Sequence, residues 1–404
     1  MAGMVIIGGG MAGARGIINL RACGYEGAIT LISEEKLLPY DRPPLSKAAI
    51  TEEGEPVPVW LLDAGIVASL KADVKLGYAA ASIDRAAKQV VLADGTAVSY
   101  EKLLLATGAK PRKLNTPGGE HALLLRDFAD IIVLRARFAP GKKIVIIGGG
   151  FIGLELAATA SKRGARVTVV EAQPRILMRG VPETIAKIVH DRHVAAGIEM
   201  RTGIGISALH HDSVQLADGS VLPADTIIAG IGAAPETRIA AEAGLLIENG
   251  IACNEHLQTS DPDIYAAGDC CSFIHTRYEN RRLRFEAWRS AQEQAATAAE
   301  NMMGAAKIHK AIPWFWSDQH DLSLQIAGMP DMGPVTVTRH PAEGVVLLFH
   351  LAEDGRLMGA SAIGPGNSIA RDVKMAEMMM AKGMSPSAAA LSDSAVQLKS
   401  LLKT

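Results

Sequence analysis

Cysteine is scarce in this chain: the 404 residues include only Cys23, Cys253, Cys270 and Cys271. They form no C-x-x-C pair and show no metal-ligand spacing, so we expect no metal site. The pattern also argues against a disulfide framework and fits a reducing compartment. Cys270 and Cys271 are neighbours, but a disulfide between neighbours is strained, so we expect no redox role for them.

An excess of one charge and long apolar runs are also missing. Lysine and arginine total 41 against 43 acidic residues, and a net charge of −2 gives no global sign of nucleic-acid or anionic-membrane binding. No apolar run approaches the roughly 20 residues that span a bilayer. The first apolar strand begins within about four residues of the start, with no signal-peptide pattern before it. We therefore expect a cytoplasmic protein that binds neither membrane nor nucleic acid.

Glycine, by contrast, is placed in a meaningful pattern. The stretch KIVIIGGGFIGLELAATASKRGARVTVVE covers residues 143–171. An apolar strand runs into Gly148, Gly150 and Gly153, and a small-residue helix and a second strand ending at Glu171 follow. This is the G-x-G-x-x-G pattern in its required context, in which backbone N–H groups meet a pyrophosphate at the positive end of a helix. Glu171 falls where an acid accepts hydrogen bonds from a ribose 2′-hydroxyl.

The same pattern opens the chain. A strand runs into Gly8, Gly10 and Gly13, and a helix and a second strand ending before Glu34 follow. Two copies of one supersecondary unit predict two separate dinucleotide sites.

Each copy is followed by a hairpin pattern and a buried strand. The turns are predicted at Asp94-Gly95 and Asp218-Gly219. The first of these buried strands ends in Ala106, Thr107 and Gly108, where the backbone could lie against a bound nucleotide.

Three further stretches carry polar or aromatic groups. The proline-rich loop KLLPYDRPPLSK carries Arg42 and Lys47, and its rigid prolines suit a loop that aims cations at a ligand, although a solvated basic turn is an alternative. Asp269 follows a small-residue strand and could bind a polyol or cap a helix. The length predicts two or three domains, and the composition changes near residue 311, where PWFWSDQ opens a region of strands followed by helices.

Together these motifs resemble the FAD-dependent, NADH-linked ferredoxin reductases of bacterial oxygenase systems, the putidaredoxin-reductase type. The resemblance covers essentially the whole chain, and RPPLSK and PWFWSDQ are its most specific parts. It implies an α/β fold with two Rossmann-like nucleotide-binding domains and a C-terminal α+β interface domain. The FAD domain would comprise residues 1–108 and 234–308, the inserted NAD domain residues 109–233, and the interface domain residues 309–404.

The resemblance also implies binding residues. Those for FAD, together with the strand end noted above, are Gly8, Gly10, Ala12, Gly13, Glu34, Arg42, Lys47, Ala80, Ala106, Thr107, Gly108, Arg126, Asp269 and Trp288. Those for NADH are Gly150, Ile152, Gly153, Glu155, Glu171, Arg179 and Gly232. Trp316 is expected near the flavin and the face that meets the ferredoxin.

The chemistry implied is hydride transfer from NADH to FAD, and then single electrons to a [2Fe–2S] ferredoxin that supplies a Rieske dioxygenase or a cytochrome P450. Lys47 and Glu155 are the expected catalytic pair: the ammonium stabilises negative charge arriving on the flavin, and the carboxylate keeps the ammonium charged and aimed. No cysteine stands where related disulfide reductases carry a redox pair, so electrons must leave to an external acceptor.

Four points stay open at this stage. Glu171 favours NADH over NADPH, but Arg175 or Arg179 could reach an adenosine phosphate. The segment 277–289 carries Arg277, Arg281, Arg282, Arg284 and Arg289, which either steer an acidic ferredoxin or form a solvated hairpin. An NAD(P)H oxidase or quinone reductase and a redox-sensing protein like apoptosis-inducing factors are the alternative functions, and the oligomeric state could be a monomer or a weak dimer.

Overall fold

The computed structural model describes residues 2–403 and divides them into two compact units. Unit 1 comprises residues 2–42, 58–110 and 233–311, and unit 2 comprises residues 43–57, 111–232 and 312–403. The chain therefore passes between the units several times, and RPPLSK is divided after Arg42. Short strands β7 (Ala109–Pro111) and β15 (Ala233–Pro235) stand where two of these passages occur.

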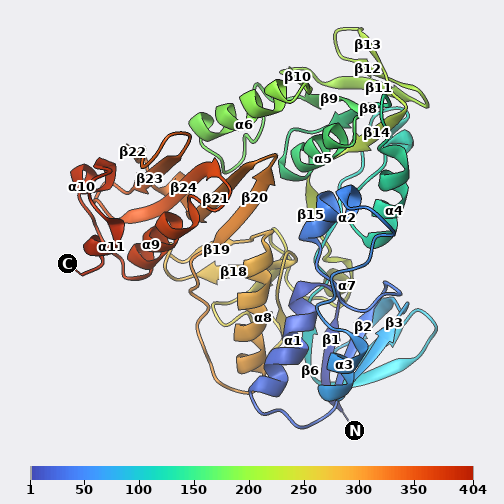
Figure 1. Cartoon of the computed structure of the whole chain (residues 1–404). Coiled ribbons are helices and arrows are strands. Elements are labelled where there is room, and N and C mark those ends of the chain that lie inside the picture. The colour runs from blue at the N-terminus through green and yellow to red at the C-terminus, as the bar shows by residue number, and fades with distance from the viewer. Residues whose placement is uncertain (1, 404) are drawn as a thin grey trace. The chain divides into compact units, whose positions relative to one another are not determined.

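Unit 1 is built on a parallel sheet. Its strands β3, β2, β1 and β6 are parallel neighbours, β17 pairs with β6, and β5 and β4 continue the sheet antiparallel. The five residues of β1, GMVII, are all buried, as expected of a central parallel strand covered on both faces. Figure 1 shows helices α1 and α8 side by side in this unit.

The elements of unit 1 are β1 (Gly3–Ile7), α1 (Met11–Ala22), β2 (Ile29–Ser33), α3 (Ala64–Ser69), β3 (Ala72–Leu76), β4 (Ala80–Asp84), β5 (Gln89–Leu92), β6 (Ala97–Leu105), α7 (Arg238–Glu242), β16 (Ile251–Cys253), β17 (Ile264–Ala266), β18 (Cys271–His275), β19 (Arg281–Leu283) and α8 (Trp288–Met302).

Unit 2 contains a second parallel sheet, in the order β10-β9-β8-β14, and a small antiparallel sheet, β11-β12-β13. Its last part is a five-stranded antiparallel sheet, β20-β21-β24-β23-β22, with helix α9 packed on β24 and β21. Figure 1 draws this C-terminal part in orange and red.

The elements of unit 2 are η1 (Pro43–Ser46), α2 (Ala48–Thr51), η2 (Gly119–His121), α4 (Phe128–Arg137), β8 (Lys143–Ile147), α5 (Phe151–Lys162), β9 (Arg166–Glu171), α6 (Glu183–Ala195), β10 (Glu199–Thr202), β11 (Ile206–His210), β12 (Ser213–Leu216), β13 (Val221–Pro223), β14 (Thr226–Ala229), β20 (Trp314–Gln319), β21 (Leu322–Gly328), η3 (Pro330–Met332), β22 (Val335–Arg339), β23 (Val346–Leu351), β24 (Leu357–Pro365), α9 (Ala370–Ala381), α10 (Ala388–Ser392) and α11 (Leu398–Leu401).

Both predicted hairpins are confirmed, and they are built alike. Asp94 Oδ1 accepts from Thr96 N, and Asp218 Oδ1 accepts from Ser220 N, at 2.9 Å in each case. Gly95 and Gly219 both have φ of +86°, which glycine adopts without a steric cost. The duplication therefore extends beyond the glycine motifs. The predicted fold class is also confirmed, with two Rossmann-like parallel sheets and a C-terminal region of strands followed by helices.

Candidate functional site

The two glycine turns have nearly the same backbone. Gly8 has φ of +117° and Gly148 has φ of +109°, values that other residues rarely adopt. Gly10 and Gly150 then stand as N-caps of α1 and α5 in extended conformation, and neither helix has a side-chain cap. The first N–H groups of both helices are therefore left for another acceptor, and an anion is the partner that the helix dipole favours.

Different glycines in these turns are required for different reasons. A Cβ on Gly13 would lie 1.9 Å from Gly8 O, and one on Gly153 would lie 2.2 Å from Gly148 O, so these two allow helix and strand to pack. A Cβ on Gly10 would meet no protein atom within 4 Å, and one on Gly150 would meet only Gly230 O at 3.9 Å. Protein packing does not explain these two glycines, whereas the close approach of a pyrophosphate does.

A strand end lies against each turn. A Cβ on Gly8 would lie 2.1 Å from Ala106 O, and one on Gly148 would lie 2.4 Å from Gly230 O. In unit 1 the Thr107 hydroxyl donates to Glu236 O at 2.6 Å. The strand end at residues 106–108 therefore lies beside the first glycine turn. In unit 2, residues 230–232, which include Gly232, take the equivalent place.

Two more elements of unit 1 meet near the first turn. A Cβ on Gly268, which precedes Asp269, would lie 3.2 Å from Ala12 Cβ, so this loop covers the start of α1. Trp288 Nε1 donates to Asp41 Oδ1 at 2.5 Å at the start of α8. Burial raises the pKa of Asp41, while the hydrogen bond from Trp288 opposes that rise. Unit 1 thus places the glycine turn, the strand end and the Asp269 loop together.

The other predicted FAD residues of unit 1 lie further along the sheet. Arg42 forms an ion pair with Glu35 and lies over the Tyr40 ring, with 5.3 Å between its Cζ and the ring centroid. Glu34 is exposed at the end of β2, and Ala80 begins β4. Arg42 therefore contacts Glu35, the residue that follows Glu34, and has this protein carboxylate as its partner.

In unit 2, Glu171 is already engaged with backbone. Its two oxygens accept from Gly149 N at 2.7 Å and from Gln173 N at 2.8 Å. This holds the carboxylate beside the glycine turn. Ile152, on the first turn of α5, is 48% exposed.

The two arginines that left the choice of nucleotide open have different surroundings. Arg175 donates to the carbonyl oxygens of Ile176, Leu177 and Val181 at 3.0–3.1 Å, so it is used to hold its own loop. Arg179 is exposed, and its Nη2 would lie 3.4 Å from a Cβ on Gly232. Of the two, Arg179 is the one placed beside the predicted nucleotide residues.

Lys47 and Glu155, far apart in sequence, meet in unit 2. Lys47 Nζ lies 3.1 Å from Glu155 Oε1 and 3.6 Å from Asp318 Oδ2. Glu155 is 5% exposed, and it also accepts at 2.5 Å from Ser46 Oγ and at 2.5 Å from Ser317 Oγ. The oxygens of this buried carboxylate are therefore supplied with hydrogen-bond donors, as buried polar groups require.

Side chains from α4, from α5 and from the residue that follows α5 hold the backbone of the segment that contains Lys47. Arg135 Nη1 donates to Ala49 O at 3.0 Å and to Ile50 O at 3.1 Å, and Arg163 Nη1 donates to Ile50 O at 2.8 Å. The Thr159 hydroxyl donates to the carbonyl oxygen of the residue before Lys47 at 2.7 Å. Helices α4 and α5 therefore fix the position of Lys47.

Trp316 lies in the same region. Lys47 Nζ is 6.0 Å from the centroid of its ring, and the ring stacks on Trp314 with 5.3 Å between centroids. Phe315, on the other face of β20, meets Phe151 edge to face at 4.9 Å. The remaining predicted residue, Arg126, stands just before α4, where its N–H donates to Asp130 Oδ2 at 2.7 Å.

The arginine-rich segment of unit 1 is largely engaged within that unit. Arg282 pairs with Glu248 and donates to two carbonyl oxygens, and Arg284 pairs with Glu286. Arg289 pairs with Glu293 on α8. These contacts agree better with a structural hairpin than with a set of charges kept for a partner, and steering of a ferredoxin by this segment stays a prediction.

The cysteines are all free thiols. Cys253, Cys270 and Cys271 are buried, and burial raises the pKa of Cys270 to about 11 and also raises that of Cys271. A thiol with so high a pKa is a poor nucleophile. Within residues 2–403, no group of three His, Cys, Asp or Glu side chains is placed to hold a metal ion.

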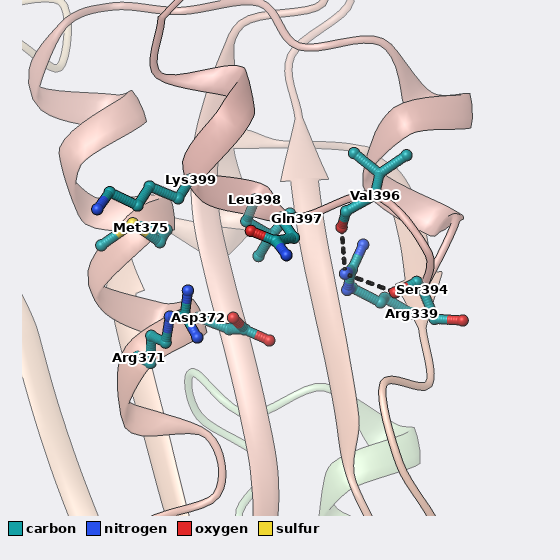
Figure 2. Close-up of a pocket in the computed structure, with 9 residues that line it drawn as sticks. All are labelled: Arg339, Arg371, Asp372, Met375, Ser394, Val396, Gln397, Leu398 and Lys399. Carbon is teal, nitrogen blue, oxygen red and sulfur yellow. Dashed lines mark hydrogen bonds between the residues drawn. The ribbon is translucent and has the colours of Figure 1, made fainter.

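The pocket in Figure 2 lies in the C-terminal part of unit 2 and has a volume of about 150 Å³. It is smaller than the roughly 300–1,000 Å³ of ordinary small-molecule sites. The Arg339 guanidinium at its edge donates to Asp393 O and Val396 O at 2.7 Å and thereby fastens the C-terminal segment. The pocket contains none of the predicted site residues.

Several residues of this site were missed from the sequence. Asp41, Ser46, Ser317 and Asp318 all lie inside motifs that had been singled out. The available signal was the period of two along PWFWSDQ, which puts Ser317 and Gln319 on one face of β20 and Asp318 on the other. His193, described below, had no such signal.

Comparison with known proteins agrees with this geometry. The pyridine nucleotide-disulphide oxidoreductase family model matches residues 3–295, and the reductase C-terminal model matches residues 314–402. The ferredoxin–NAD(+) reductase component of the anthranilate 1,2-dioxygenase system from Burkholderia cepacia is 36% identical over 405 residues, covering 98% of each chain. Putidaredoxin reductase from Pseudomonas putida is 37% identical over 340 residues, covering 81% of this chain and 80% of that protein.

The crystal structure of the covalent putidaredoxin reductase–putidaredoxin complex is similar in three dimensions, with a TM-score of 0.93 at 32% identity. It covers 100% of this chain and 98% of that chain. The resemblance seen in the sequence motifs is thereby confirmed, and the cofactors are FAD and NAD(H). No helix within residues 2–403 has both the length and the apolar character needed to cross a membrane. The chain belongs to the pyridine nucleotide-disulphide oxidoreductase family.

Proposed function

We propose that this enzyme passes electrons from NADH through FAD to a [2Fe–2S] ferredoxin that serves an oxygenase. The observation that carries the proposal is the lack of any cysteine between Cys23 and Cys253, since the electrons then have no protein thiol to leave through after the first glycine turn. The relatives named for a dioxygenase system and for putidaredoxin, each at least 36% identical, support the choice of acceptor.

Bound FAD supplies the chemistry of accepting a hydride and releasing single electrons. The turn from Gly8 to Gly13, with Ala12, is proposed to hold its pyrophosphate, because Gly10 leaves room for it above the N-terminus of α1. The remaining proposed FAD residues are Glu34, Arg42, Lys47, Ala80, Ala106, Thr107, Gly108, Arg126, Asp269 and Trp288.

NADH is proposed to bind at the second turn. Gly150 leaves the corresponding space at the N-terminus of α5. The Glu171 carboxylate, held beside this turn, would accept a hydrogen bond from a ribose hydroxyl and would repel a 2′-phosphate. Arg175 is engaged with its own loop. Of the two arginines, Arg179 is therefore the one that could bind a 2′-phosphate and so weaken the preference for NADH. The remaining proposed NADH residues are Ile152, Gly153, Glu155 and Gly232.

Lys47 and Glu155 are the proposed catalytic pair. The Lys47 ammonium can stabilise negative charge on a ring bound beside it, and Glu155 keeps that ammonium charged. Glu155 is suited to this task because three donors hold it: Lys47 itself, Ser46 and Ser317.

The division into an FAD domain (1–108 and 234–308), an inserted NAD domain (109–233) and an interface domain (309–404) is part of the proposal. So is a cytoplasmic location, which the four free thiols support.

Anaerobic and aerobic turnover of the FAD-loaded enzyme tests the function. We expect NADH oxidation to be slow with oxygen alone and at least about tenfold faster with an added [2Fe–2S] ferredoxin, whose reduction is followed by its visible spectrum. Lys47→Met, loaded with a full complement of FAD, should be reduced by NADH more slowly than the unchanged enzyme. Fast turnover with oxygen or a quinone and none with ferredoxin would instead indicate an oxidase or quinone reductase, and a slowly formed, long-lived complex with NADH would indicate a redox sensor.

A further inference from the structure

A series of hydrogen bonds continues from Glu155 through β20 to helix α6. Ser317 Oγ donates to Glu155 Oε1 at 2.5 Å, and Gln319 Nε2 donates to Ser317 Oγ at 2.8 Å. His193 Nε2 lies 3.0 Å from Gln319 Oε1, and His320 Nε2 lies 3.3 Å from His193 Nδ1. We refer to Ser317, Gln319, His193 and His320 as the Glu155 support chain.

The donors and acceptors of the support chain can have only one order while Glu155 is ionised. A carboxylate only accepts, so the Ser317 hydroxyl must donate to it, and Ser317 then accepts from the Gln319 amide. This turns the Gln319 carbonyl toward His193, which must carry its proton on Nε2. The Nδ1 atom of His193 is left to accept from His320. Every orientation in the support chain therefore follows from the charge on Glu155.

The inner part of the support chain is sealed from water. Ser317 is 1% exposed, and Gln319 and His193 are 0% exposed. Buried polar groups of this kind are held to their partners because water cannot replace a lost hydrogen bond. Burial also lowers the pKa of His193 to about 4, so the ring is neutral near pH 7, as the order of donors requires.

The outer end of the support chain is fixed to α6 by two neighbouring residues. His320 and Asp321 form the turn between β20 and β21, and His320 has φ of +61°, where a side chain is rarely found. Arg192 Nε donates to Asp321 Oδ1 at 2.5 Å, next to the His193–His320 contact. Helix α6 therefore holds in place a turn that the local backbone alone would not favour.

We propose that Gln319, His193 and His320 are positioning residues for the Lys47–Glu155 pair. They fix the Ser317 hydroxyl so that it donates to Glu155 Oε1, which keeps the carboxylate aimed at the Lys47 ammonium. This inference rests on the proposed function, in which that pair acts when NADH reduces the flavin. The residues act through Ser317 and do not move protons themselves, because the Gln319 amide in the middle of the series is not a group that exchanges its proton readily.

Reversing the direction of the support chain is the sharpest test. In Gln319→Glu, the new carboxylate accepts from both His193 and Ser317, so the Ser317 proton is drawn away from Glu155. We expect the rate of anaerobic flavin reduction at saturating NADH to fall at least about tenfold, with FAD content and NADH dissociation constant within twofold of the unchanged enzyme. Gln319→Leu and His193→Gln, which interrupt the chain without reversing it, should cost roughly threefold to tenfold.

His350→Gln is the matched control. His350 is also buried in unit 2, its Nε2 lies 3.1 Å from Ser361 Oγ, and burial lowers its pKa to about 4, but it is outside the support chain. It should lower the melting temperature about as much as His193→Gln while the reduction rate stays within twofold. Equal rate losses in the two histidine variants, or none in Gln319→Glu, would overturn the proposal.

A second measurement does not depend on activity. Nitrogen-15 NMR of histidine-labelled protein, with the His193 signal assigned by its loss in His193→Gln, should show a neutral ring protonated on Nε2. Gln319→Leu should expose that proton to fast exchange. A His193 ring protonated on Nδ1 would refute the order of donors.

Glu155→Gln and Lys47→Met separate this inference from the proposed function. If neither slows flavin reduction, the catalytic pair itself is wrong, even where the NMR result is as expected. If both slow it and the Gln319 variants do not, the catalytic pair stands and the positioning role is wrong.

Discussion

The glycine turn of unit 1, Gly8 to Gly13, and that of unit 2, Gly148 to Gly153, share a backbone but differ in what covers them. In unit 1 the residue before the third glycine, Ala12, is 5% exposed and lies under the Gly268 loop. Its counterpart in unit 2, Ile152, is 48% exposed. One local structure can thus form a covered site or an open one. The covered site suits a cofactor that stays, and the open site suits a substrate that must leave in each turnover.

The two turns differ again one helical turn later. The fifth residue of α1 is Arg15, whereas the fifth residue of α5 is Glu155. Glu155 is buried among the donors of Ser46, Ser317 and Lys47, while Arg15 is close enough to Asp41 to lower its pKa against the effect of burial. A duplicated element therefore keeps its glycine-turn backbone and acquires a different charged side chain at a single helix position.

The largest effect is expected from a methyl group at the two open glycines. Alanine can adopt the backbone of Gly10 (φ −85°, ψ −166°) and of Gly150 (φ −83°, ψ 178°), and it would meet no close protein atom. Gly10→Ala should fold but lose FAD about tenfold or more, because overpacking against the cofactor costs about 1–3 kcal/mol. Gly150→Ala should keep its FAD and raise the KM for NADH by a similar factor. FAD content by absorbance and steady-state kinetics check both.

Gly13→Ala is the control for these two variants. Its Cβ would lie 1.9 Å from Gly8 O, so it should lower the melting temperature even without cofactor. Loss of FAD in Gly150→Ala but not in Gly10→Ala would reverse the assignment of the two sites.

An intermediate effect is expected from the acids that follow the two turns. Glu171→Ala should lower the ratio of kcat/KM for NADH over NADPH about tenfold, because it removes both a ribose acceptor and the repulsion of a 2′-phosphate. Glu34→Ala should leave this ratio unchanged but weaken FAD binding, since Glu34 is proposed to bind FAD and not NADH. Arg175→Ala should lower the melting temperature without changing nucleotide preference. A wild-type preference for NADPH would show that the role given to Glu171 is wrong.

The smallest effect concerns acid. Burial lowers the pKa of His309 in unit 1 to about 3 and that of His350 in unit 2 to about 4. Below the unfolded value of about 6.5, the unfolded chain binds protons that the folded chain does not, so stability falls as pH drops from about 6.5 toward 4. His309→Gln and His350→Gln should each reduce this fall by up to about 1.4 kcal/mol for each pH unit below about 6.5.

Melting temperatures measured between pH 7 and pH 4.5 check this prediction. Comparing each variant with the unchanged protein removes the contribution of the carboxylates, because the same carboxylates titrate in both. An unchanged pH dependence in both variants would mean that these histidines accept protons in the folded state as readily as in the unfolded one.

Much of the candidate site could be read from the sequence because it is local. The φ values of Gly8 and Gly148 and the starts of α1 and α5 depend on neighbouring residues, and the G-x-G-x-x-G spacing encodes them. The two hairpins were predictable for the same reason, since an Asp-Gly pair determines a tight turn. Lys47 and Glu155 came from a likeness to a family, and the sequence itself carries no sign that they meet.

By itself, the sequence determined the two glycine turns, the strand, helix and strand that succeed one another around each turn, and the absence of cysteine between residues 23 and 253, because each depends on a short pattern or on composition. Only the tertiary structure decided which polar groups surround Glu155. Its hydrogen bond with Ser317 joins residues 162 positions apart, and that of His193 with Gln319 joins residues 126 apart. Contacts over such separations depend on how helices and sheets pack, and packing determines burial, charge and the direction of each hydrogen bond.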